Sequence, residues 1–328
     1  MSNTATVLAF DFGASSGRAI RAVYDGQNLT YEEIHRFENV PIEKDGHLCW
    51  DVETLLKEIH TAIQKAGTFD SLGFDTWGVD FGLLDTDGHL LANPVHYRDV
   101  RTNGKLEQAA ARMPAEELYA HTGNQIMAIN TLFQLLALRE QDPELLQKAE
   151  QILFMPDLFA ALLGAEPVCE RSIASTSQML DPRTGQWSRE VLAAYGLNAN
   201  RFAPLVASGT VTGTLANGAK IIAVAGHDTQ CASAAMPCAE EDAEHTAFLS
   251  CGTWSLLGTE LDAPILTADS CQSGLSNELG ANGKINYLKN IIGLWLIQES
   301  RREYKRRGQA YSFAELEQQA LAAEPLRS

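Results

Sequence analysis

The sequence predicts a mixed α/β protein with two lobes, and three patterns carry that prediction. An apolar run at residues 7–10 leads through a small-residue turn into a second apolar run at 19–24, which is typical of a β-hairpin. The same pattern recurs at residues 246–258. A segment with helical spacing at 52–63 precedes a buried strand at 71–76, which indicates a crossover to a parallel strand. Two lobes that each open on such a hairpin suggest a duplicated unit.

The first lobe is expected to begin with three strands and a crossover helix. Residues 6–40 contain the three strand-like runs, with a turn at 25–28 before the third. Asp51 is a typical N-cap for the next helix, and Gly67 is a typical residue after its end. Helical spacing relates the apolar residues Val52, Leu55, Leu56, Ile59 and Ile63. The predicted order is therefore β-β-β-α-β.

The middle of the chain is expected to alternate helical and irregular segments. Residues 103–163 are predicted to be mainly helical, with stops at prolines, and residues 170–205 to be irregular. A strand at 220–225 precedes a helix from about Thr229. We expect these elements to complete the first lobe.

An acidic connection at residues 237–244 is the expected boundary between the lobes. It divides the chain into residues 1–237 and residues 238–328. After the second hairpin, two further helices are predicted, at 299–307 and 313–323.

Composition excludes several classes of function. The chain has 328 residues, 45% of them hydrophobic, and a net charge of −17. A nucleic-acid surface needs clustered positive charge, so no nucleic-acid partner is expected. No apolar stretch is long enough to cross a bilayer, and the N-terminus lacks the features of a signal peptide, so no membrane association is expected. Six cysteines without a Cys-x-x-Cys pair suggest a reducing, cytoplasmic setting. The oligomeric state is left open.

The first hairpin turn, residues 11–18, carries groups that suit phosphate binding. Gly13 and Gly17 can take positive φ and let backbone N–H groups approach a ligand. Serine hydroxyls and the guanidinium of Arg18 add donors and positive charge. Asp11, at the end of the strand, could hold a hydrated cation. The alternative is that glycine and serine serve turn geometry only, because the turn is neither a P-loop nor a dinucleotide fingerprint.

Five segments in fixed order carry a resemblance to a known family. They are residues 11–18 (DFGASSGR), 75–81 (DTWGVDF), 226–229 (GHDT), 250–255 (SCGTWS) and 289–298 (KNIIGLWLIQ). Together they closely resemble the FGGY carbohydrate kinase family, and within it the rhamnulokinase branch. The resemblance runs from residue 6 to about residue 305. It implies the actin-like, Hsp70-like ATPase fold, which is ribonuclease H-like, with ATP and Mg²⁺ as cofactors.

The resemblance also implies roles for individual residues. Asp228 matches the catalytic aspartate, the general base, and Asp11 should help to position Mg²⁺. The residues implied in ATP binding are Ala14, Ser15, Ser16, Gly17, Arg18, Gly252, Thr253 and Gln298. The residues implied in sugar binding are Trp77, Gly78, Asp80, His227, Asp228, Thr229 and Asn290. Asn290 is expected at the start of a helix, with Gln298 along one face of it.

Each of these side chains also has a purely structural interpretation. Asp228 and Thr229 could cap a helix. Asp75 could be a turn residue, and Asp80 a charged residue of a hairpin. Trp254 and Trp295 are expected in the core, and Trp77 in contact with sugar. Arg98 either meets the substrate or makes a structural ion pair, and we favour the ion pair.

The implied function is ATP-dependent phosphorylation of L-rhamnulose at its 1-hydroxyl, in rhamnose catabolism. Residues 1–237 would form the sugar-binding lobe. Residues 238–328 would form a partial nucleotide-binding lobe, because the adenosine-binding segment of the family is missing, so weak ATP binding and slow or absent turnover are expected. The alternatives are a kinase for xylulose or fuculose, a truncated non-catalytic sugar-binding protein, and an actin-like ATPase that works on protein partners.

Overall fold

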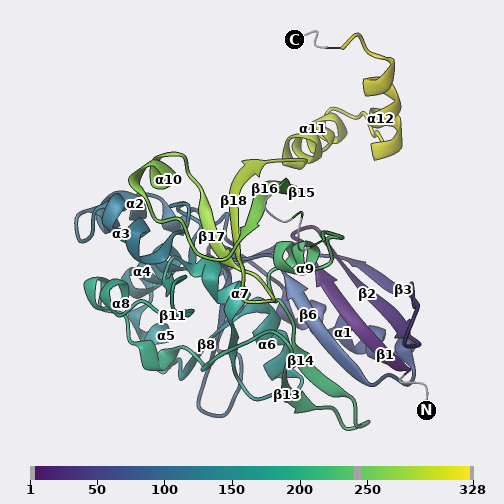
Figure 1. The fold of residues 1–328 in the computed structure, drawn as a ribbon, viewed down its shortest axis with the longest axis horizontal. Helices are drawn as coiled ribbons and strands as arrows, with labels where there is room; N and C mark the ends of the chain where they lie inside the picture. Colours follow the sequence, from purple (N-terminus) through teal and green to yellow (C-terminus); the bar gives the residue numbers. More distant parts are fainter. Residues whose placement is uncertain (1–3, 240–241, 243–244, 326–328) are drawn as a thin grey trace.

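Two β-sheets form the framework of the molecule (Figure 1). The computed structural model describes residues 4–239, 242 and 245–325. We call the part from β1 to α9 the first lobe and the part from β15 to α12 the second lobe. The predicted connection at 237–244 runs between them, and its residues 240–241 and 243–244 lie outside the described residues.

The first lobe is built on a six-stranded sheet in the order β13-β14-β6-β1-β2-β3. Its strands are β1 (Ala5–Phe12), β2 (Ser16–Tyr24), β3 (Leu29–Glu38), β6 (Ser71–Thr76), β13 (Thr210–Thr214) and β14 (Lys220–Ala223). The first three strands are antiparallel, and β6 pairs with β1 in parallel after the crossover helix α1 (Val52–Ala66). The predicted β-β-β-α-β order is therefore confirmed.

The crossover helix forms where the sequence predicts it. The Oδ1 atom of Asp51 accepts the backbone N–H of Thr54 at 3.2 Å, which caps the first turn of α1. Gly67 follows with φ 66°, a conformation that favours glycine. The apolar stripe of α1 is buried at Val52, Leu55, Ile59, Ala62 and Ala66.

A stack of aromatic rings fills the core of the first lobe. Phe10 and Phe12 lie on one face of β1, because side chains alternate along a strand. The ring centroid of Phe10 lies 4.8 Å from that of Phe74 in β6, and that of Phe12 lies 4.8 Å from that of Phe159 in α6 (Met155–Leu162). Asp11 therefore points to the opposite face, which is less buried.

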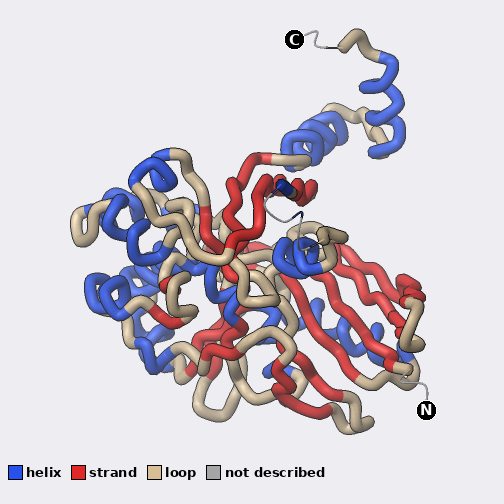
Figure 2. Tube along the Cα trace, in the orientation of Figure 1, coloured by secondary structure: helices blue, strands red, loops and turns tan. Residues whose placement is uncertain are grey.

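Small elements pack beside the large sheet, and Figure 2 shows many of the helices on the left and the long strands on the right, with α9 above the strands. The helices are α2 (Lys105–Ala110), α3 (Ala115–Thr122), α4 (Thr131–Gln141), α5 (Pro143–Lys148), α7 (Arg171–Ala174), α8 (Arg189–Tyr195) and α9 (Asp228–Ala234). Short paired strands are β4 (Ile42–Lys44) with β5 (His47–Cys49), β7 (Phe81–Leu84) with β8 (Gln151–Phe154), β9 (Cys169–Glu170) with β12 (Leu205–Val206), and β10 (Leu180–Asp181) with β11 (Gln186–Trp187). The mainly helical prediction for 103–163 is confirmed, with β8 as an added strand.

The second lobe is an antiparallel sheet in the order β15-β16-β18-β17. Its elements are β15 (Phe248–Cys251), β16 (Trp254–Leu261), α10 (Ala268–Gln272), β17 (Ser276–Leu279), β18 (Ile285–Ile292), α11 (Trp295–Arg306) and α12 (Phe313–Ala322). The predicted second hairpin is β15 with β16. Figure 1 shows α11 and α12 extending away from the body, and neither helix has a buried residue. Of the helices that the structure describes, none has the length and apolar character needed to cross a bilayer.

Candidate active site

A cavity of about 280 Å³ lies where the two lobes meet. Residues of both hairpin turns, of the loop after β6 and of the N-terminus of α9 line it. Among its lining residues are Gly13, Ala14, Ser15, Trp77, Gly78, His227, Asp228, Thr229, Gly252, Thr253 and Asn290. The structure therefore brings together most of the residues that the sequence singles out.

The first hairpin turn forms one wall of the cavity through Gly13, Ala14 and Ser15. The N–H of Gly13 donates to the carbonyl of Ser16 at 2.8 Å, and the side chain of Asn39 donates to the carbonyl of Gly13 at 2.9 Å. These bonds fix the shape of the turn from both sides.

The structure of this turn differs from what the sequence suggests in two respects. Neither Gly13 nor Gly17 has a positive φ. Gly17 is required for a different reason, because a Cβ there would overlap the ring of Phe37 on β3. Ser16, Gly17 and Arg18 belong to β2 and are not among the lining residues.

The guanidinium of Arg18 is held by Asp11. Its Nη2 lies 2.6 Å and its Nε 2.8 Å from Oδ2 of Asp11. The two residues are also register partners across β1 and β2. The positive charge of Arg18 is therefore shared with the carboxylate that the sequence assigns to the cation.

Three aspartates act on one another through their charges, and of these only Asp228 lines the cavity. Asp11 and Asp75 are register partners in parallel strands, and Asp228 begins α9. Burial, followed by repulsion from Asp11 and Asp228, raises the pKa of Asp75 well above the ordinary aspartate value. Carboxylate oxygens are ligands that Mg²⁺ accepts, so Asp11 and Asp75 offer suitable donor chemistry, although the three aspartates do not form a compact metal-binding cluster among the described residues.

The turn of the second hairpin forms the facing wall through Gly252 and Thr253. The N–H of Gly252 donates to the carbonyl of Trp254 at 2.9 Å, which closes the turn. The side chain of Gln298 on α11 donates to Oγ1 of Thr253 at 3.3 Å. The predicted pair Thr253 and Gln298 is thus joined in the structure.

The loop after β6 places Trp77 and Gly78 in the wall and Asp80 behind it. Asp80 is 1% exposed, and its Oδ2 accepts hydrogen bonds from Nε1 of Trp77 at 3.0 Å and Nε1 of Trp50 at 2.6 Å. Its Oδ1 accepts from the side chain of Gln134 at 2.8 Å. Burial raises the pKa of Asp80 to about 6, although these hydrogen bonds act in the opposite direction. Asp80 was expected to bind sugar, but it does not line the cavity and instead supports Trp77 from below.

The N-terminus of α9 presents Asp228 to the cavity. The backbone N–H and the hydroxyl of Thr229 both donate to Oδ1 of Asp228, at 2.5 and 3.1 Å. The side chain of Asp228 is 41% exposed, which fits its position in the wall. Desolvation raises the pKa of Asp228, while His227 and Thr229 act to lower it. Oδ1 is thus held within the protein, and the carboxylate faces the cavity.

Asn290 lines the cavity but does not start a helix. It lies in β18, opposite Leu256 of β16, and its side chain donates to Oε1 of Gln125 at 3.2 Å. Residues 289–292 continue β18 because they pair with residues 254–257 of β16, and α11 begins only at Trp295.

The sequence analysis missed Glu278 entirely. This residue of β17 is 4% exposed, lines the cavity, and accepts a hydrogen bond from Nδ1 of His227 at 2.9 Å. Three consecutive polar residues in a four-residue strand give no alternation, so the sequence pattern does not reveal the strand.

Arg98 packs against aromatic rings rather than against a carboxylate. No carboxylate among the described residues lies within ion-pair distance of it, so the expected ion pair is wrong. Its Cζ instead lies 5.2, 5.6 and 5.1 Å from the ring centroids of Tyr97, Trp254 and Trp295. The expectation that Trp254 and Trp295 are core residues is also wrong, because both are only partly buried. The guanidinium joins a first-lobe ring to two second-lobe rings.

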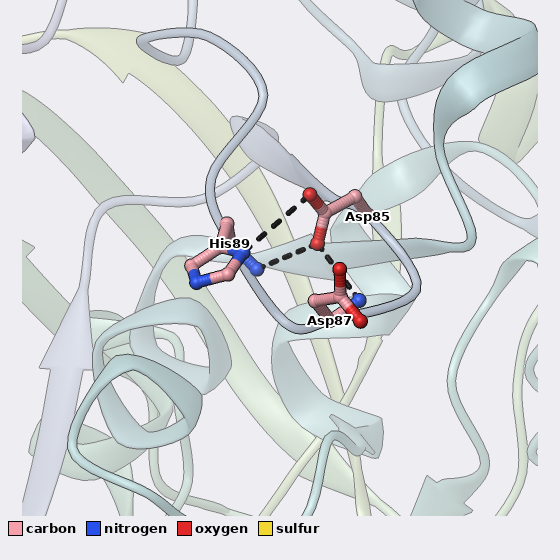
Figure 3. Close-up of side chains that lie close together, drawn as sticks. All are labelled: Asp85, Asp87 and His89. Atoms are coloured by element: carbon pink, nitrogen blue, oxygen red, sulfur yellow. Dashed lines mark hydrogen bonds and ion pairs between the residues drawn. The ribbon is translucent and has the colours of Figure 1, made fainter.

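A second cluster of polar groups lies outside the cavity. Figure 3 shows Asp85, Asp87 and His89 close together in one turn, with ligand atoms within 4.8 Å of one another. Oδ1 of Asp85 accepts the backbone N–H groups of Asp87 at 2.9 Å and of His89 at 2.8 Å. These bonds are typical of an aspartate that closes its own turn, and they account for the cluster.

The chain matches two domains of one family. Residues 6–234 match the N-terminal domain of the FGGY family of carbohydrate kinases, and residues 247–328 match the C-terminal domain. The two matched ranges lie on either side of the connection between the lobes.

Among curated proteins, the chain is 40% identical to a rhamnulokinase of Bacteroides thetaiotaomicron, over 98% of this chain and 67% of that protein. It is also 40% identical to a rhamnulokinase of Halalkalibacterium halodurans, over 94% of this chain and 67% of that protein. The chain thus spans about two thirds of the length of these relatives.

Two solved structures share the fold. The ligand-bound xylulose kinase from Lactobacillus acidophilus has a TM-score of 0.70 and 17% identity, over 87% of this chain and 59% of that one. A xyloylose kinase from Brucella ovis has a TM-score of 0.74 and 21% identity, over 94% and 64%. With the family match, these likenesses identify the actin-like ATPase fold with two domains, as expected.

Proposed function

Because the chain belongs to the FGGY family of carbohydrate kinases, we propose that its cleft transfers the γ-phosphoryl group of ATP to a ketose. The proposed substrate is L-rhamnulose and the acceptor is its 1-hydroxyl, by likeness to the curated rhamnulokinases. One observation carries the proposal: a single cavity is lined by Asp228 and by the turns of both hairpins. Phosphoryl transfer uses a carboxylate that accepts the proton of the attacking hydroxyl and backbone or side-chain donors that hold the phosphates. The lining of this cavity offers both kinds of group.

Asp228 is the proposed general base. It accepts the proton of the 1-hydroxyl as the oxygen forms a bond to the γ-phosphorus, and the bond from that phosphorus to the leaving ADP oxygen breaks. The raised pKa of Asp228 makes it a stronger base at neutral pH. Thr229 holds Oδ1, which leaves Oδ2 to meet the hydroxyl.

The two hairpin turns are the proposed ATP site. Ala14 and Ser15 would approach the phosphates from the first lobe, and Gly252 and Thr253 from the second. Gln298 supports this role through its hydrogen bond to Thr253. Ser16, Gly17 and Arg18 would act less directly, by fixing the turn that precedes them.

Asp11 is the proposed holder of Mg²⁺, with Asp75 as a neighbouring carboxylate. When bound, the ion neutralises charge on the phosphates. Arg18 already pairs with Asp11, so the ion pair restricts the orientation of this carboxylate. The proposed sugar contacts are Trp77, Gly78, His227, Thr229 and Asn290, all of which line the cavity. Asp80 would act through Trp77.

A coupled assay of ADP release tests the proposal. The chain is mixed with MgATP and each of L-rhamnulose, xylulose and fuculose in turn, with a control that lacks sugar. We expect the largest sugar-dependent rate with L-rhamnulose. A larger rate with xylulose or fuculose would keep the reaction and change the substrate.

Calorimetry of sugar binding separates the remaining alternatives. Binding of L-rhamnulose without any sugar-dependent ADP release would indicate a non-catalytic sugar-binding protein. ADP release that no sugar stimulates would favour an ATPase that acts on protein partners, and would contradict the proposed function.

A further inference from the structure

One carboxylate of the second lobe contacts the start of α9. Glu278 lies in β17, and its Oε2 is 2.9 Å from Nδ1 of His227. The other ring nitrogen of His227, Nε2, lies 3.4 Å from Oδ1 of Asp228. His227 therefore stands between two carboxylates, one from each lobe.

Side chains of β17 and of the neighbouring strand β18 make further hydrogen bonds to α9. Oε2 of Glu278 also accepts a hydrogen bond from Nε2 of Gln230 at 2.8 Å. The side chain of Asn286 on β18 donates to Oε1 of Gln230 and, at 2.9 Å, to Oγ of Ser233. Positions 227, 230 and 233 are three residues apart, so they share one face of the helix. This face of α9 is hydrogen-bonded to β17 and β18.

The imidazole of His227 is positioned to carry a charge. It is 8% exposed, and a buried charge needs a partner. Burial alone lowers the pKa of His227, but attraction and a hydrogen bond from Glu278, and then attraction to Asp228 and Asp75, raise it to about 9. At neutral pH His227 is therefore an imidazolium, which favours the ionised form of Asp228.

Other titratable groups also act on this site. Those that influence His227, Asp228 or their neighbours are Asp11, Arg18, Asp75, Glu170 and Cys231. Among the partners of His227, Glu278 makes the shortest contact, and it is the one that comes from the second lobe.

We propose that Glu278 is a positioning residue for phosphoryl transfer, which holds His227 and, through it, fixes the carboxylate of Asp228. The inference rests on the proposed function, in which Asp228 accepts the proton. Loss of Glu278 leaves His227 without its counter-charge, and Asp228 then loses both its neighbouring cation and its fixed orientation.

The direct test is the titration of His227 by NMR in the ¹⁵N-histidine-labelled chain, with its signal assigned by its absence in His227→Asn. We expect it to titrate near pH 9 in the unchanged chain and at a lower pH in Glu278→Gln, which removes the largest influence that raises this pKa. Glu278→Asp keeps the charge, so we expect its titration to stay above the ordinary histidine value. Glu260→Gln changes a carboxylate on β16 that bonds Asn282, and it should leave the titration unchanged.

Kinetics with L-rhamnulose provide the second measurement. Glu278→Gln should lower kcat by about 10²-fold with KM for ATP unchanged, because the base is misplaced while the nucleotide turns are intact. The acid limb of the pH profile should move to higher pH, since Asp228 no longer faces a cation. Loss of stability alone would leave that limb in place.

An identical His227 titration in Glu278→Gln and the unchanged chain would overturn the inference. So would a folded Glu278→Gln variant with an unchanged kcat and pH profile. If the unchanged chain releases no ADP with any ketose, the proposed function fails, while the NMR titration still decides whether Glu278 controls His227.

Discussion

Oδ2 of Asp80 lies 3.0 Å from the indole nitrogen of Trp77 and 2.6 Å from that of Trp50. The ring centroids of the two tryptophans are 4.0 Å apart, so one buried carboxylate orients a pair of packed rings. Trp77 lines the cavity, whereas Asp80 lies behind it. The wall next to the proposed sugar site therefore depends on a residue that does not touch the cavity.

The raised pKa of Asp80 predicts a specific pH dependence of stability. The group binds its proton more tightly in the folded chain, with a pKa of about 6 against an ordinary value of 3.8. The stabilisation that comes from this raised pKa is therefore fully present below about pH 4 and is lost as the pH rises to about 6. Asp80→Asn removes the titration.

We expect the free energy of unfolding of Asp80→Asn, relative to the unchanged chain, to rise between pH 4 and pH 6. The amide of Asn at this position cannot accept all the hydrogen bonds that the carboxylate accepts, which lowers the stability of the variant. This loss of stability does not vary with pH. Urea denaturation at several pH values gives the slope. A difference that stays constant across this range would contradict the burial argument.

Gly17→Ala should destabilise the fold by about 1–3 kcal/mol through overpacking. The added Cβ overlaps the ring of Phe37, which is 8% exposed and cannot move into solvent without cost. Urea denaturation measures the loss. In a Phe37→Leu background the same change should cost less, and an equal cost in both backgrounds would show that the ring is not responsible.

Arg98→Met should weaken the contact between the lobes. It keeps the length of the side chain but removes the cation from between Tyr97, Trp254 and Trp295. We expect a loss of about 1 kcal/mol in the free energy of unfolding. Arg183→Met, at a surface pair with Asp181, is the matched control and should cost less. Equal effects of the two variants would argue against a role for the aromatic contacts.

Asp11→Asn should separate nucleotide binding from sugar binding. The change removes a carboxylate from the proposed Mg²⁺ site and weakens the hold on Arg18. Calorimetry should show weaker ATP binding that depends less on Mg²⁺ concentration, with the affinity for L-rhamnulose nearly unchanged. A large loss of sugar affinity, measured without nucleotide, would count against the assignment of Asp11.

Local patterns predicted the framework of the fold because its main elements carry local signals. Both hairpins and the capped helix α1 follow from apolar spacing and turn residues alone. The resemblance to the FGGY family, rather than a local pattern, implied that the first turn and Asp228 belong to one site. The conformation of Gly17 was misjudged because its requirement comes from Phe37 across the sheet, which turn propensity does not contain.

The contacts between the lobes could not be predicted in the same way. His227 and Glu278 are 51 positions apart, and their pairing depends on how β17 docks against α9. Arg98 likewise finds its aromatic partners only when the two lobes meet. Such contacts depend on tertiary packing, so a single sequence gives no periodic signal for them.

The central claim is that Asp228 is the base that activates the 1-hydroxyl of L-rhamnulose in this cleft. Its most direct test is the rate of phosphate-ester formation from MgATP and L-rhamnulose, followed by ³¹P NMR, in the unchanged chain and in Asp228→Asn. Asp87→Asn, in the exposed turn, is the matched control. We expect a 1-phosphate from the unchanged chain and the control, and a rate about 10²–10⁴-fold lower in Asp228→Asn with sugar binding retained. A near-normal rate in Asp228→Asn, or no sugar phosphate from the unchanged chain, would contradict the claim.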